Sequence, residues 1–150
     1  MKNDSLFNIY KTYGIFDTSH FIDKLTYPLL LKLGYIPTLN EIYNLMDVYC
    51  HPFTSGGMEI PIFEAKMTEL VTLVTNYSCG EDSSSRECGS FALDWSEYRE
   101  PGTQFIKAST YPSSIAKQLK KVWQMDKNKL REMGKKAREW TVENYSTTAV

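Results

Sequence analysis

A glycine pair followed by two glutamates is the part of this sequence whose residue types and spacing could do chemistry. Gly56 and Gly57 come just before Glu59, and Glu64 follows five residues later. Glycines let backbone amides approach a phosphate or a sugar without a Cβ in the way. A carboxylate such as that of Glu64 can accept hydrogen bonds from paired hydroxyls, for example those of a ribose. The segment therefore predicts a polar ligand site, with a plain surface turn before a helix as the alternative interpretation.

Two predicted elements must position these residues. Residues 47–52 are typical of a short buried strand, and Pro61 suits the first turn of a helix over about 61–68. The order of strand, glycine loop and helix N-terminus favours an anion, because the first helical amides lack partners and the helix dipole adds positive potential. His51 lies at the end of the strand and could reach the ligand, although a packed or solvated histidine is the alternative.

The rest of the chain alternates strands and helices. Strands are predicted over 30–36, 70–75 and 103–108, and apolar spacing predicts a helix over 5–13 within an irregular lead-in over 1–30. A capping box over 38–41 opens a helix to about residue 46. Residues 76–102 are predicted to be one long polar loop.

Two helices should close the chain. One begins at Pro112 with Trp123 among its inward residues, and Asp126 caps the second. In the long loop, Trp95 and Tyr98 predict either contact with an acceptor or a cluster that anchors the loop. Strand–helix alternation predicts an α/β fold, a Rossmann-like parallel sheet flanked by helices, with a ligand crevice at the carboxyl ends of the strands.

Composition limits the class of protein. The 150 residues suit a single domain, and 42% hydrophobic with 23% charged residues is typical of a globular protein. A formal charge of −1 argues against nucleic acid as a partner. No apolar run is long enough to span a membrane and the start resembles no signal peptide, so a cytoplasmic location is expected.

From Gly34 onward the chain resembles the C-terminal, donor-binding domain of retaining GT-B glycosyltransferases of the group 1, or family 4, type. Residues 57–65, GMEIPIFEA, are similar to the family's GfGlpvlEA motif, and residues 47–52, DVYCHP, to its aDvfv.Ps strand. Residues 70–76, LVTLVTN, are similar to G.PVVatd, and segments 114–119 and 133–138 to the two closing helices. The resemblance covers roughly three quarters of the chain.

The resemblance implies one GT-B half, without some of its first strands, that transfers a sugar from a UDP- or GDP-sugar to an acceptor with retention and without a metal. In the family the second of two glutamates binds the nucleotide ribose, and here it aligns with Glu64. The first, which binds the donor sugar, would fall on Gly56, while Glu59 occupies a usual glycine. Base recognition is expected through the backbone around Tyr35.

The residues implied to act in this site form two groups. Glu59 and His51 are the catalytic candidates, and the nucleotide-sugar contacts are Ser55, Gly56, Gly57, Met58, Ile60, Glu64 and Tyr35. No Asp-x-Asp metal motif occurs in the sequence.

Two departures from the family pattern leave alternatives open. No segment before Gly34 matches the family's Arg and Lys that pair with the donor diphosphate, and no acceptor-binding domain precedes it. Either the chain belongs with an N-terminal acceptor domain or a second copy of itself, or it is a non-catalytic nucleotide-sugar-binding or assembly module.

Overall fold

The computed structural model describes residue 34 and residues 38–149 of the chain. The chain divides into two units, Met1–Pro37 and Thr38–Val150, and the second unit contains all the helices and strands given below. The predicted lead-in over 1–30, the helix over 5–13, the strand over 30–36 and the base-recognition residue Tyr35 lie outside the described residues.

A strand–helix–strand unit forms the centre of the second unit. It consists of β1 (Val48–His51), α4 (Ile60–Met67) and β2 (Val71–Thr75). The two strands pair in parallel, with His51 opposite Val74. Parallel neighbours need a long crossover connection, and α4 supplies it. The predicted strands over 47–52 and 70–75 and the helix over about 61–68 are confirmed.

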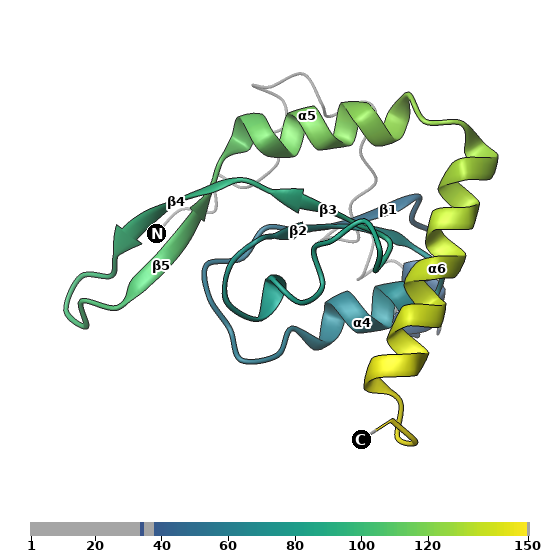
Figure 1. Cartoon of the computed structure of the whole chain (residues 1–150), viewed down its shortest axis with the longest axis horizontal. Helices are drawn as coiled ribbons and strands as arrows, with labels where there is room; N and C mark the ends of the chain where they lie inside the picture. The colour runs from purple at the N-terminus through teal and green to yellow at the C-terminus, as the bar shows by residue number, and fades with distance from the viewer. Residues whose placement is uncertain (1–33, 35–37, 150) are drawn as a thin grey trace. The chain divides into compact units, whose positions relative to one another are not determined.

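The sheet has three parallel strands in the order β1-β2-β3, with β3 (Ser90–Leu93) on the other side of β2. All five residues of β2 are buried, because helices cover both of its faces (Figure 1). α5 (Pro112–Trp123) packs against β3, whereas α4 and α6 (Lys127–Tyr145) pack against β2 and each other. The chain is therefore a mixed α/β protein with a three-stranded parallel sheet flanked by helices, as the sequence predicts at this level of detail.

The prediction of one polar loop over 76–102 is wrong. The segment contains the 3₁₀ turn η2 (Ser78–Gly80), the parallel strand β3 and the strand β4 (Trp95–Arg99). Its polar residues are satisfied inside the fold: the hydroxyls of Thr72 and Ser90, which face each other across β2 and β3, lie 2.6 Å apart. A buried strand that begins with a paired serine has no continuous apolar run, so the pattern does not reveal it.

A hairpin leaves the sheet at the end of β3. β4 pairs antiparallel with β5 (Ile106–Thr110) in a separate two-stranded sheet. The predicted strand over 103–108 overlaps β5 only at residues 106–108, and β5 lies outside the parallel sheet. The backbone N–H of Tyr111 donates to the carbonyl of Asp94 at 2.9 Å, so the hairpin starts and ends at neighbouring points. Figure 1 shows it projecting beyond the sheet.

The helices begin at the capping residues that the sequence predicts, but Trp123 does not point inward as predicted. Thr38 and Glu41 form the predicted capping box of α3 (Leu39–Asn44), and the Asp126 carboxylate accepts from the amides of Asn128 and Lys129 at the start of α6. Trp123, predicted to point inward, has 89% of its surface exposed. It is the last residue of α5, one position past the buried Val122, where the helix turns its side chain away from the sheet.

Candidate functional site

The loop between β1 and α4 places the predicted ligand-binding residues at the carboxyl end of the parallel sheet. It runs over residues 52–59, and α4 begins at Ile60 with Pro61 in its first turn. Ser55, Gly57, Met58 and Ile60 are exposed, whereas Gly56 and Glu59 are partly covered. Glu59 is the N-cap residue of α4 but its side chain does not bond to the helix amides. The carboxylate is therefore available for other partners.

Glu59 is held by a row of side chains on β1. His51 Nε2 lies 3.0 Å from Glu59 Oε2, and His51 Nδ1 lies 3.1 Å from the Tyr49 hydroxyl. A neutral imidazole satisfies all three groups: the Tyr49 O–H donates to Nδ1, and the Nε2–H donates to the carboxylate. Side chains two apart on a strand share a face, so Tyr49 and His51 stack with ring centroids 5.6 Å apart.

Gly56 makes room for the Glu59 carboxylate. A Cβ built on Gly56 would overlap Glu59 Oε1, so no larger residue fits at position 56 while this carboxylate keeps its place. At Gly57 an added Cβ would meet nothing within 4 Å. The loop thus brings the Glu59 carboxylate back over residue 56, to the point where a side chain of residue 56 would begin.

Glu64 is bonded on one side. It lies on α4, is partly covered, and its Oε2 accepts a hydrogen bond of 3.1 Å from the hydroxyl of Tyr43 on α3. Burial, together with the hydrogen bond to the Glu64 carboxylate, raises the pKa of Tyr43 far above its ordinary value of 10.0, so this phenol stays protonated. Glu64 Oε1 has no hydrogen-bond partner in the described part of the chain. One oxygen of Glu64 is therefore positioned by Tyr43 and the other is open.

The structure connects the two candidate carboxylates through one aromatic cluster, with Glu64 bonded to Tyr43 and Glu59 to His51. Tyr43 packs edge-on against Tyr49, with ring centroids 5.6 Å apart, and each tyrosine belongs to one of the two hydrogen-bonded groups. Burial and the nearby carboxylates of Glu64 and Glu59 raise the pKa of Tyr49, although its contact with Tyr43 opposes that shift. Both glutamates thus act on the same phenol.

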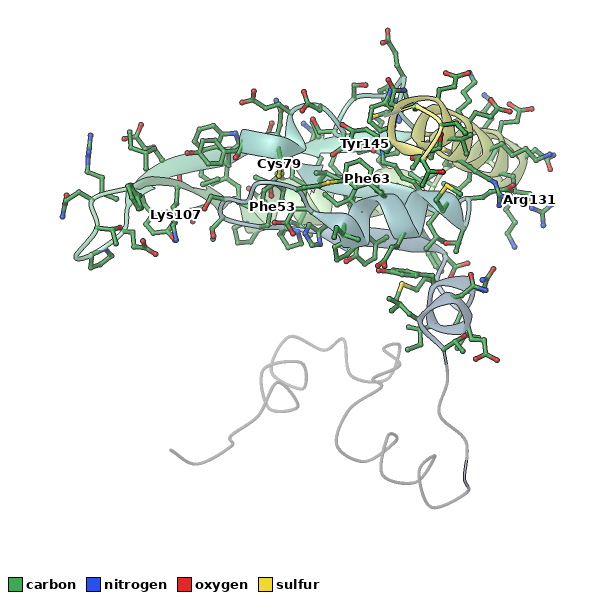
Figure 2. The ribbon with its side chains drawn as sticks, turned by 90° about the horizontal axis from the view of Figure 1, so that it is seen from below. Phe53, Phe63, Cys79, Lys107, Arg131 and Tyr145 are labelled. Carbon is green, nitrogen blue, oxygen red and sulfur yellow. The ribbon has the colours of Figure 1, made fainter. Side chains whose placement is uncertain are left out.

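Phe53 links this cluster to the end of β2. Its ring lies 5.5 Å from that of His51, and its N–H donates to the Thr75 hydroxyl at 3.1 Å. Gly80 on η2 touches the Phe53 ring so closely that an added Cβ would collide with it. Figure 2 shows Phe53 and Cys79 near the middle of the molecule, with Lys107 toward the hairpin end.

An open hollow of about 430 Å³ lies beside Phe53. The β1–α4 loop, the hairpin and the start of α5 line it, and the residues are Pro52, Phe53, Thr54, Tyr98, Ala108, Ser109, Thr110 and Ile115. Tyr98 lines this hollow, but Trp95 does not: the Trp95 indole N–H donates to the Asn76 carbonyl at 2.6 Å, and its ring packs on Tyr77. Of the two roles open for Trp95, the contacts match the anchoring one.

The sequence motifs single out His51 but not Tyr43, Tyr49 and Phe53, the other aromatic side chains around the site. Tyr49 and His51 alternate on β1, and Phe53 continues the spacing of two into the loop that follows, a signal that is present in the sequence. The bond from Tyr43 to Glu64 spans 21 residues, and no local pattern reveals it. Among residues 34 and 38–149, no group of three or more His, Cys, Asp or Glu side chains could hold a metal ion.

Comparison of the chain with protein-family models, with characterised proteins and with solved structures finds no match in any of the three. In the part of the chain that the structure describes, no helix is long and apolar enough to cross a membrane.

Proposed function

We propose that this chain is the donor-binding half of a retaining GT-B glycosyltransferase, with a Rossmann-like fold, and that it binds a nucleoside diphosphate sugar at the β1–α4 loop. The observation that carries the proposal is the overlap of Glu59 with the side-chain position of residue 56. The resemblance to such enzymes lacks its first glutamate at Gly56, and the Glu59 carboxylate returns to that place. The family has a glutamate at position 56 and a glycine at position 59, whereas this chain has Gly56 and Glu59. In both arrangements one carboxylate would be available to the donor sugar.

Each group then has a separate task. Glu64 Oε1 accepts from the ribose hydroxyls while Tyr43 holds Oε2 in place. The loop amides and the start of α4 face the diphosphate, whose negative charge the helix dipole stabilises. Glu59 accepts from hydroxyls of the donor sugar, and His51 positions it through the 3.0 Å hydrogen bond. In transfer, the bond from the sugar C1 to the diphosphate oxygen breaks, the acceptor oxygen bonds to C1, and the acceptor proton leaves with the diphosphate.

Calorimetric titration of the full chain with UDP- and GDP-sugars tests the proposal. We expect one of them to bind, and Glu64→Ala to weaken the binding by roughly tenfold or more because a charged hydrogen bond is lost. Glu132→Ala, which removes an exposed glutamate of α6, is the matched control and should bind as the wild type does. A folded sample that binds no donor at millimolar concentration would refute the proposal.

Turnover separates the enzyme from a non-catalytic binding module. Release of free sugar or nucleoside diphosphate from the bound donor by the chain alone would exclude the binding module. Binding without release, followed by release once an acceptor-binding partner is added, would support the donor half of a two-part enzyme. Binding with no release under either condition would support the module.

A further inference from the structure

The outer face of α5 has an unusual composition. Val122 and Ser114 are buried, and Ile115 and Gln118 are half-buried, so these residues form the face toward the sheet. Figure 1 shows α5 along one side of the sheet, with no other labelled helix over its outer side. Within residues 38–149, the side chains on that outer side are exposed.

An apolar stripe runs along this outer side. Ala116, Leu119 and Trp123 follow each other at spacings of three and four, which places them on one side of a helix. Leu119 is 38% exposed and Trp123 is 89% exposed. An exposed tryptophan offers a large apolar surface to a partner, and Leu119 on the same side of the helix extends it, so the stripe is a candidate contact surface.

Lysines accompany the stripe. α5 carries Lys117, Lys120 and Lys121 and no acidic residue, although the whole chain has a formal charge of −1. Lys121 lies over the Phe91 ring, 5.1 Å from its centroid. Lys117 and Lys120 are exposed, and neither has an ion-pair partner within residues 38–149. Their charge is thus available to a negative partner.

We propose that α5 docks on an anionic lipid surface, with Trp123 and Leu119 entering the headgroup region and Lys117 and Lys120 meeting lipid phosphates. Charge complementarity selects a negative partner, and the adjoining apolar stripe selects a membrane over a soluble polyanion. Helices that bind at membrane interfaces combine Trp or Leu with Lys in this way. Lysines near such a surface each contribute favourably, while nucleic acid would leave the exposed Leu119 without an apolar partner.

Vesicle sedimentation of the full chain tests this docking. We expect binding to vesicles with 30% phosphatidylserine, little binding to pure phosphatidylcholine, and loss of binding in high salt. The double variant Lys117→Gln, Lys120→Gln should lower the partition coefficient by roughly thirtyfold. Lys135→Gln, Lys136→Gln removes the same charge from exposed sites on α6 and should lower it far less. Equal losses in the two double variants would overturn the proposal, since they would indicate unspecific charge attraction.

Tryptophan fluorescence supplies a second readout. Brominated lipids should quench the emission of the wild type, and Trp123→Phe should remove the quenched component while the protein still binds. If quenching persists in Trp123→Phe, a different surface enters the membrane and the proposal fails. If the chain binds heparin or RNA as tightly as it binds the vesicles, and brominated lipids do not quench Trp123, the partner is a soluble polyanion and the proposal fails. Circular dichroism of each variant confirms that it is folded.

Discussion

The Glu59 carboxylate occupies the space directly beside the Cα of Gly56, so a side chain at position 56 would displace this carboxylate. The side chain of one residue fills the place that the other leaves empty. His51 completes the arrangement because its Nε2 holds the second carboxylate oxygen at 3.0 Å.

Gly56→Ala therefore should displace the Glu59 carboxylate and separate it from His51. We expect donor affinity to fall by roughly tenfold, the effect of losing one charged hydrogen bond, while the fold remains intact. Calorimetry with the best-binding donor measures the change. Gly57→Ala is the matched control, because a Cβ there meets nothing within 4 Å. Equal effects of the two variants would mean that loop flexibility, and not the position of Glu59, decides affinity.

Tyr43→Phe removes the hydrogen bond that holds Glu64 and leaves the ring in place. We expect the free energy of unfolding to drop by about 2 kcal/mol, since the lost bond joins a buried phenol to a carboxylate. Urea denaturation measures this. Because Glu64 would lose its fixed orientation, donor binding should weaken as well. An unchanged stability would show that water replaces the phenol at no cost.

Lys66 is a buried charge on α4 that stabilises the connection between β2 and β3. It is fully buried, and its ammonium donates to the carbonyls of Ser83 at 3.0 Å and Cys88 at 2.6 Å. The Trp140 ring lies 4.6 Å from it. Lys66→Met should lower the free energy of unfolding by about 3 kcal/mol, because two buried carbonyls lose a charged donor.

Hydrogen exchange tells this role from simple packing. In Lys66→Met the amides of residues 83–89 should exchange faster, whereas those of β1 should change less. Lys135→Met, which alters an exposed lysine of α6, should leave both stability and exchange near the wild type. A stable Lys66→Met variant with unchanged exchange would contradict the role.

Alkaline pH should destabilise the fold through Cys50. Burial raises the pKa of this thiol from 9.0 to about 11, so the folded state holds the proton more strongly than the unfolded state. The stability from this group is complete below pH 9 and is lost as the pH rises through about 11. Burial raises the pKa values of Tyr49 and Tyr145, which act in the same direction at higher pH.

Cys50→Ala should flatten the fall in unfolding free energy between pH 8 and pH 11, as measured by urea denaturation at each pH. Lys66 acts in the opposite direction: desolvation lowers its pKa, so the folded state releases the proton first and its contribution rises with pH. The wild type and Cys50→Ala both contain Lys66, so the difference between their unfolding free energies at each pH reports the contribution of the Cys50 thiol. Parallel curves for the two proteins would contradict the assignment.

Glu69 occupies a position that glycine normally takes. It follows the C-cap residue of α4 with a φ of 61°, in the left-handed region. Glu69→Gly should raise the free energy of unfolding by about 1 kcal/mol, because glycine adopts this φ without steric cost. Thermal unfolding measures the gain. A lower melting temperature would mean that the greater freedom of glycine in the unfolded chain outweighs the relief of strain.

The sequence predicts the elements that have a continuous apolar run or a capping residue. β2 reads as a continuous apolar run and proves to be buried along its whole length, and Asp126 announces α6 through its own hydrogen bonds. β4 is missed because all five of its residues are exposed or half-buried, whereas β5 overlaps the predicted strand at residues 106–108. A hairpin that satisfies its backbone away from the core leaves little trace in the hydrophobic pattern.

The candidate site was predictable to the same extent. Order along the chain was enough to place the glycine loop at the end of a parallel strand. The position of Glu59 over Gly56 depends on how the loop turns, and the bond from Tyr43 to Glu64 depends on how α3 meets α4. The first is set by the backbone conformation of the loop and the second is a tertiary contact, and residue types and spacing alone contain neither.

The turn of the hairpin is a suitable position for a fluorescent label. Its tip is closed by its own bonds, from the Glu100 N–H to the Phe105 carbonyl and from the Gln104 N–H to the Glu100 carbonyl. Gly102 stands there in open space. A cysteine introduced at the neighbouring exposed Thr103 would carry a fluorophore in the turn between β4 and β5. Figure 1 shows this turn at the end of the hairpin away from α5, so donor binding and lipid binding could be followed on one labelled molecule.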